Sequence, residues 1–101
     1  MADATQIIGV KQTANIPSIA SDATAIALNT ARAWWFIQNL GTNVLFVRLG
    51  ASASTTVFHY ALSAGTGNDD GLGGSVETGI VVYTGIITVA GTSPRYVALE
   101  L

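Results

Sequence analysis

Residues 34–49 decide the fold, and they read Trp34-Trp35-Phe36-Ile37-Gln38-Asn39-Leu40-Gly41-Thr42-Asn43-Val44-Leu45-Phe46-Val47-Arg48-Leu49. Two runs rich in aromatic and β-branched residues flank a short segment of small or polar residues that includes a glycine. This pattern predicts a strand over 34–40, a tight turn at 41–43 and a strand over 44–49, paired as a β-hairpin.

Both faces of this predicted hairpin are apolar. Side chains alternate across a strand, so Trp34 and Phe36 share one face while Trp35 and Ile37 share the other. A hairpin that is apolar on both sides needs cover on both sides. We therefore expect a second sheet to cover one face. The other face also needs cover, and another subunit is a candidate for it.

The rest of the chain indicates further strands and no long amphipathic helix. We expect strands over 24–29, 55–62, 76–82, 85–90 and 96–101, and an exposed glycine-rich loop over 63–75. In the last strand Tyr96, Ala98 and Glu100 face one way and residues 97, 99 and 101 the other. Seven to eight short strands at near-regular spacing predict an all-β, single-domain antiparallel β-sandwich or jelly-roll-like barrel.

The N-terminal part differs from the rest. Residues 1–22 are small and polar, apart from a short apolar segment that contains Ile7, Ile8 and Val10, and Pro17 interrupts the region. Because proline lacks a backbone donor, we expect an extended N-terminal arm over 1–22 with at most an edge strand, followed by the β-domain over 23–101. Such an arm could reach a neighbour or lie on its own domain.

The charge content is low for a protein surface. Charged residues make up 10% of the chain and hydrophobic residues 50%, whereas soluble domains carry roughly 25% charged residues. A compact monomer of this mass would expose about 5,400 Å². We therefore expect much of the surface to be buried against other copies or another protein.

Composition also disfavours several classes of partner and location. The chain has four basic residues, Lys11, Arg32, Arg48 and Arg95. Because they are scattered along the sequence, they argue against nucleic-acid binding. There is no apolar run of membrane-spanning length, and the N-terminus lacks the pattern of a signal peptide, so we expect a soluble product without export. The absence of cysteine fits assembly in a reducing cytoplasm.

We find no pattern that predicts catalysis or a cofactor. His59 is the only histidine, and nothing places Ser54 and an acid beside it, so we expect a structural histidine, neither a hydrolase nor a zinc site. Asp69 and Asp70 offer oxygen ligands, but one short loop rarely encloses calcium. The sequence leaves open whether loop 63–75 binds calcium or a glycan.

Several turns carry a resemblance to a known group of proteins. The segments concerned are 37–43, 45–50, Asn68-Asp69-Asp70-Gly71, Tyr83-Thr84-Gly85 and Ala90-Gly91-Thr92-Ser93-Pro94. Together they resemble small virion proteins of tailed bacteriophages, among which head decoration (cement) proteins fit best. The resemblance spans residues 32–101 and leaves the arm unmatched.

This resemblance implies a function and a set of partners. It implies a non-enzymatic β-sandwich or jelly roll, often a homotrimer, that binds the major capsid protein on the assembled shell and ties capsomers together. The product would lie on the capsid surface after assembly in the host cytoplasm. The alternative is a glycan-binding or host-adhesion module of a tail or head fibre. Our candidate interface residues are Ile7, Ile8, Val10, Trp34, Trp35 and Phe36.

Overall fold

The structure is a computed structural model that describes residues 11–14 and 22–101, and in these residues the chain forms eight strands and no helix. The prediction of an all-β chain is therefore confirmed. The strands are β1 (Lys11–Ala14), β2 (Asp22–Ile26), β3 (Trp35–Asn39), β4 (Leu45–Leu49), β5 (Tyr60–Leu62), β6 (Ser75–Glu77), β7 (Ile87–Ala90) and β8 (Tyr96–Glu100).

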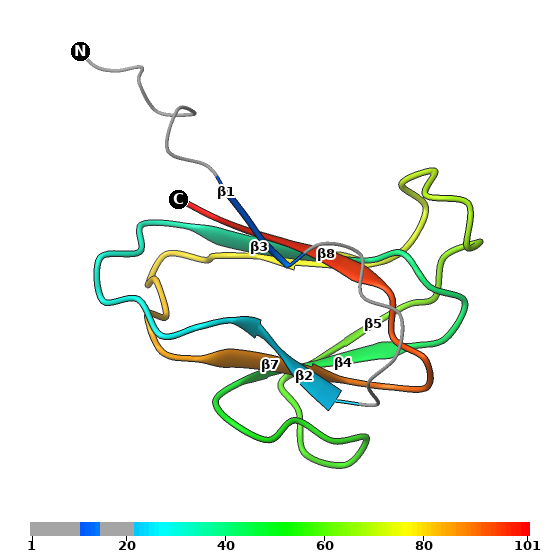
Figure 1. Ribbon diagram of the computed structural model, residues 1–101, viewed down its shortest axis with the longest axis horizontal. Helices are drawn as coiled ribbons and strands as arrows, with labels where there is room; N and C mark the ends of the chain where they lie inside the picture. The colour runs from blue at the N-terminus through cyan, green and yellow to red at the C-terminus, as the bar shows by residue number, and fades with distance from the viewer. Residues whose placement is uncertain (1–10, 15–21) are drawn as a thin grey trace.

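The strands form two antiparallel sheets of four. The first sheet has the order β1-β8-β3-β6 and the second the order β2-β7-β4-β5. Figure 1 shows the two sheets as two layers with the core between them. The pairs β1–β8, β2–β7, β3–β6 and β4–β5 are all adjacent, so the second half of the chain runs back along the first.

The predicted hairpin over 34–49 is wrong, because β3 and β4 belong to different sheets. β3 pairs with β8 along five residue pairs, and β4 pairs with β7 along four. Trp35 and Ile37 from β3 and Leu45 and Val47 from β4 all point into the core between the sheets. The turn at 41–43 is therefore an arch that carries the chain from one sheet to the other.

Asn39 holds this arch. Its side chain is 1% exposed, and its Nδ2 donates to the carbonyl oxygens of Asn43 (2.8 Å), Leu62 (3.1 Å) and Ser63 (3.2 Å). Its Oδ1 accepts the backbone N–H of Gly41 at 2.9 Å. One buried amide thus bonds four backbone groups where the chain changes sheets.

The core takes its side chains from both sheets. Its buried members are Ala25, Ile26, Trp35, Ile37, Leu45, Val47, Leu62, Ile87, Val89, Tyr96 and Ala98. The alternation predicted for the last strand is confirmed, with Tyr96, Ala98 and Glu100 buried and Val97 and Leu99 half-buried on the outer face. The more aliphatic set of β8 therefore points away from the core.

A long connection covers the outer face of the second sheet. The Thr88 hydroxyl donates to the Gly50 carbonyl at 2.7 Å and accepts the Ala53 N–H at 3.0 Å. The ring of Phe58 packs on that of Phe46 with centroids 4.7 Å apart. Because residues 50–59 are used in this way, the strand predicted over 55–62 is reduced to Tyr60–Leu62.

The expected arm over 1–22 falls largely outside the described residues. Of that region the structure describes Lys11–Ala14, which forms β1 at the edge of the first sheet, and Asp22, which begins β2. Residues 1–10, which include Ile7, Ile8 and Val10, lie outside the described part.

Candidate interaction surface

The outer face of the first sheet carries five half-buried apolar side chains, Trp34, Phe36, Val97, Leu99 and Leu101, which we call the outer apolar face. Phe36 lies opposite Leu99 across the β3–β8 ladder. Trp34 and Leu101 extend the ladder, since the Leu101 N–H bonds the Trp34 carbonyl at 2.9 Å and the Trp34 N–H bonds the Leu101 carbonyl at 3.1 Å. Directly opposite residues share a face, so these side chains form one continuous patch.

Two aromatic rings form the centre of this patch. Trp34 and Phe36 are stacked with an interplanar angle of 9° and ring centroids 6.1 Å apart. The Trp34 indole Nε1 donates to Glu77 Oε2 at 3.4 Å, and this is the carboxylate that borders the stack on the β6 side. On its other side the register places Gln12 beside Leu99. The patch is thus apolar, with a carboxylate at its border on the β6 side and an amide on the β1 side.

A second apolar feature lies at one end of the two layers, where the β2–β3 and β6–β7 connections meet (Figure 1). Leu28 is 67% exposed, Ile80 103% and Val81 85%, and we call these three residues the apolar knob. The two loops are joined, because the Asn29 N–H bonds the Thr84 carbonyl at 2.9 Å. The knob therefore belongs to one joined pair of loops.

A buried arginine fixes the base of these loops. The Arg32 side chain is fully buried, and its Nε bonds Glu100 Oε1 at 3.0 Å. Its Nη1 donates to the carbonyls of Tyr83 (2.8 Å) and Gly85 (3.1 Å), and its Nη2 donates to that of Ala27 (2.6 Å). A planar guanidinium suits such multiple acceptors. Arg32 thus connects both loops to β8.

The two carboxylates of loop 63–75 are each bonded to protein donors. Asp69 forms a two-pronged pair with Arg95, with Nε–Oδ1 at 3.2 Å and Nη2–Oδ2 at 2.6 Å. Asp70 accepts the Thr66 hydroxyl at 2.6 Å and the Leu72 N–H at 3.2 Å, and these bonds, the Thr66 bond above all, lower the pKa of Asp70 from its usual 3.8. Within residues 11–14 and 22–101 no group of three or more His, Cys, Asp or Glu residues could hold a metal ion.

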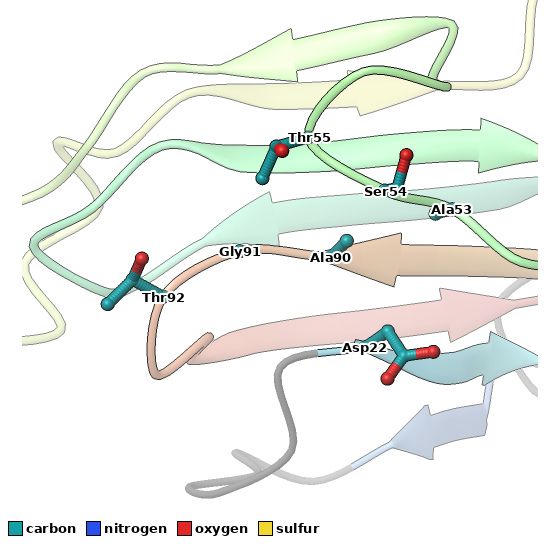
Figure 2. Close-up of a pocket in the computed structure, with 7 residues that line it drawn as sticks. All are labelled: Asp22, Ala53, Ser54, Thr55, Ala90, Gly91 and Thr92. Carbon is teal, nitrogen blue, oxygen red and sulfur yellow. The ribbon is translucent and has the colours of Figure 1, made fainter.

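An open hollow of about 440 Å³ lies between the start of β2, the end of β7 and residues 53–55. Figure 2 shows Ser54 and Asp22 on opposite sides of Ala90. The remaining lining residues are Ala53, Thr55, Gly91 and Thr92. This lining contains hydroxyls and one carboxylate but no histidine, so it does not assemble a nucleophile with a base.

His59, at the end of the 50–59 connection, forms hydrogen bonds with the backbone of β4. Its Nδ1 accepts the Leu49 N–H at 2.9 Å, and its own N–H bonds the Val47 carbonyl at 2.7 Å. The Ser54 hydroxyl oxygen accepts the Val57 N–H at 2.9 Å. Both side chains thus have backbone hydrogen-bond partners in or beside this connection.

The structure separates the predicted interface residues. Trp34 and Phe36 lie together on the outer apolar face, whereas Trp35 is 2% exposed in the core, where its ring lies 6.4 Å from that of Tyr60. Adjacent residues of a strand point to opposite faces, so Trp35 cannot take part in the same contact as Trp34. Ile7, Ile8 and Val10 are not among the described residues.

Sequence reasoning missed several residues of this surface. The sequence predicts a strand over 76–82 that includes Gly79, Ile80 and Val81, although a glycine before two apolar residues can also indicate a loop tip. Val97, Leu99 and Leu101 were recognised as one face, but their hydrophobicity gave no reason to place them outside. Nothing in the sequence indicated that Arg32 is buried.

No helix long and apolar enough to cross a membrane occurs in the described part of the chain. Comparisons of the chain with protein-family models, with curated proteins and with solved structures find no match.

Proposed function

We propose that this chain is a non-enzymatic decoration, or cement, protein that binds an assembled phage capsid and stabilises the contacts between its capsomers. The observation that carries the proposal is the outward-facing apolar surface, formed by the outer apolar face and the apolar knob, on a chain with 10% charged residues. Exposed apolar area of this kind is typical of proteins that act within assemblies. The resemblance of the turns to phage decoration proteins supports the same reading.

We further infer a jelly roll. The sheet orders β1-β8-β3-β6 and β2-β7-β4-β5 support it, because they follow when a ribbon of the pairs 1·8, 2·7, 3·6 and 4·5 is rolled into two layers. Jelly rolls occur in viral capsid proteins and in lectins. The fold is therefore compatible with both candidate functions and does not choose between them.

In this proposal the protein works by burying apolar area at several contacts at once. Each contact contributes about 25 cal/mol per Å² before the costs of ordering and association are subtracted. A homotrimer that engages the major capsid protein through each copy would bind with avidity even where single contacts are weak. The working location is the capsid surface, reached after assembly in the host cytoplasm.

The direct test is binding of the purified protein to capsids of the virus that encodes it. We expect the protein to sediment with the capsids and to raise the temperature at which they disrupt. A protein that stays in the supernatant at micromolar concentration would refute the proposal.

A truncation tests the contribution of Ile7, Ile8 and Val10. The deletion should end at residue 10, because Lys11–Ala14 forms β1 and pairs with β8. We expect the shortened protein to fold and to occupy fewer capsid sites than the full chain. Unchanged occupancy would remove the arm from the proposal and leave the remaining surface as the contact.

The second candidate is a glycan-binding or host-adhesion module, and the stacked pair Trp34–Phe36 favours it, since flat aromatic surfaces bind sugar rings. Binding to a glycan array that is lost in Trp34→Ala would support this function. Trp35→Ala is unsuitable for the same test, because Trp35 is buried in the core. A decoration protein should give no specific signal on the array.

A further inference from the structure

We propose that the apolar knob of one copy docks on the outer apolar face of a second copy, so that copies associate end to side and close into a ring. This inference rests on the homo-oligomer of the proposed function and assigns its contact to residues. The knob residues are Leu28, Ile80 and Val81, and the face residues are Trp34, Phe36, Val97, Leu99 and Leu101.

The outer apolar face keeps part of its side-chain area exposed in the described chain. The second sheet has residues 50–59 across its outer face. On the corresponding side of the first sheet the loop 63–75 bonds Gln38 through the carbonyls of Gly71 (3.2 Å) and Gly73 (3.3 Å), and the five apolar side chains of the face are half-buried. Glu77, the carboxylate at its border, is bonded to Trp34. A neutral apolar surface with such a border matches an apolar partner that brings no charge.

The knob supplies such a partner. Ile80 and Val81 are β-branched, almost fully exposed and adjacent at a loop tip, and Leu28 lies on the neighbouring loop. The base of the loop is fixed, since the Thr78 N–H bonds the Trp35 carbonyl at 2.9 Å and Arg32 bonds the Tyr83 carbonyl at 2.8 Å. A preorganised apolar tip loses little conformational entropy on docking.

The areas favour this contact over a symmetric dimer. Four strands spaced at ~4.8 Å and five residues at ~3.4 Å give the face about 330 Å². Two such faces packed on each other would bury about 650 Å² in total, or about 330 Å² on each copy, and one knob-on-face contact buries no more than that. A ring gives each copy two contacts, one through its face and one through its knob, so it buries more apolar area on each copy than the dimer does. That dimer would also leave Ile80 and Val81 in water, whereas an end-to-side contact covers face and knob on every copy.

Position also allows both contacts at once. The knob lies at the end of the two layers, and the face lies on the flank of the first sheet, so one copy can donate its knob while it accepts another (Figure 1). Contacts between different surfaces of identical chains form rings when the rotation closes. In a closed ring no knob and no face remains exposed.

Light scattering and sedimentation of three single variants test the contact. We expect the wild type to be a ring at micromolar concentration, and Ile80→Lys and Leu99→Lys each to be monomeric. Leu72→Lys is the matched control, because Leu72 is 71% exposed in loop 63–75 at the other end, and it should keep the ring. Circular dichroism checks folding, and Leu99→Asn replaces Leu99→Lys if the lysine variant unfolds.

Mixing the two monomeric variants is the decisive measurement. The Leu99→Lys copy keeps an intact knob and the Ile80→Lys copy an intact face, so together they should form a 1:1 dimer that cannot grow. A symmetric face-to-face contact would instead let Ile80→Lys dimerise alone and would exclude Leu99→Lys. Dimerisation of Ile80→Lys alone would overturn the inference. So would a monomeric wild type, or a mixture of the two variants that stays monomeric.

Capsid binding of the same samples separates this inference from the proposed function. A ring that shows the mixing result but does not bind capsids keeps the inference and refutes the function. A monomeric wild type that binds capsids keeps the proposed function and refutes the inference.

Discussion

The amide of Asn39 holds the arch between the two sheets, and replacing it should destabilise the whole domain. In Asn39→Ala the Leu62 carbonyl and the Gly41 N–H lose a buried partner, and the carbonyls of Asn43 and Ser63 lose a partly buried one. Each buried polar group left unpaired costs about 1–3 kcal/mol. With water replacing the partly buried bonds, we expect a loss of about 3–4 kcal/mol from the ~5–15 kcal/mol typical of a domain.

Asn39→Asp is the sharper variant because it preserves shape. One carboxylate oxygen can still accept the Gly41 N–H, but the other would face the three carbonyl oxygens that Nδ2 now bonds. This arrangement favours the protonated acid, so the pKa of the introduced carboxyl in the folded state should rise above the ~3.9 of an unfolded aspartate. The stability of the variant relative to wild type should then be greatest below about pH 3.9, the pKa of the unfolded aspartate, and fall as the pH rises through the raised pKa of the folded state.

Urea unfolding followed by the fluorescence of the two tryptophans measures this effect, with wild type and Asn39→Asp compared at pH 3.5 and pH 7. We expect the variant to be several kcal/mol less stable at pH 7 and closer to wild type at pH 3.5, where its acid proton can donate one bond. A variant as stable as wild type at pH 7 would refute the role assigned to the amide.

Three further outcomes follow from the contacts. Gly73→Ala should cost more than about 2 kcal/mol, since an added Cβ would overlap the Asn39 carbonyl oxygen, whereas Gly79→Ala, with open space around it, should stay within ~0.5 kcal/mol in the same unfolding assay. Arg32→Met should lower the free energy of unfolding by up to about 3–5 kcal/mol by removing the guanidinium that forms an ion pair with the buried Glu100 carboxylate, and adding Glu100→Leu should recover part of this loss. In an NMR titration the pKa of Asp70 should lie below its usual 3.8 because of its threonine hydroxyl donor, so its contribution to loop stability should be full above pH 3.8 and be lost as the pH falls from there through the lowered pKa.

Strand positions could be predicted from the sequence where one face meets the core. The alternation over 96–101 and the aromatic run that begins at Trp34 both mark real strands, because the period of two is a local property. The pairing of β3 with β4 could not be predicted in the same way. Hairpin and arch use the same strand–turn–strand pattern, and only the partners offered by β7 and β8, distant in sequence, distinguish them.

The candidate surface was harder to predict for a related reason. Aromatic residues at 34 and 36 suggested an interface, but hydrophobicity alone does not say which face of a strand is buried when both are apolar. The exposed tip at Ile80 also follows from tertiary structure, since Thr78 leaves the β6 ladder and bonds Trp35 through backbone and hydroxyl. Arg32 reads as an ordinary loop residue until the carbonyls that surround it are assembled.

The buried ion pair explains why an apolar surface faces outward at all. A slip of β8 by one residue would turn its aliphatic set inward and Glu100 outward. Bringing half-buried Val97, Leu99 and Leu101 fully into the core would gain about 1 kcal/mol each, which is a fraction of the ~1.5–3 kcal/mol for complete burial. The slip would also turn buried Tyr96 and Ala98 outward, which offsets that gain, and it would leave Arg32 buried without the Glu100 carboxylate, at a cost of about 3–5 kcal/mol. The pair therefore holds the register that keeps these aliphatic residues outside, and their remaining exposed area is free to contribute to association.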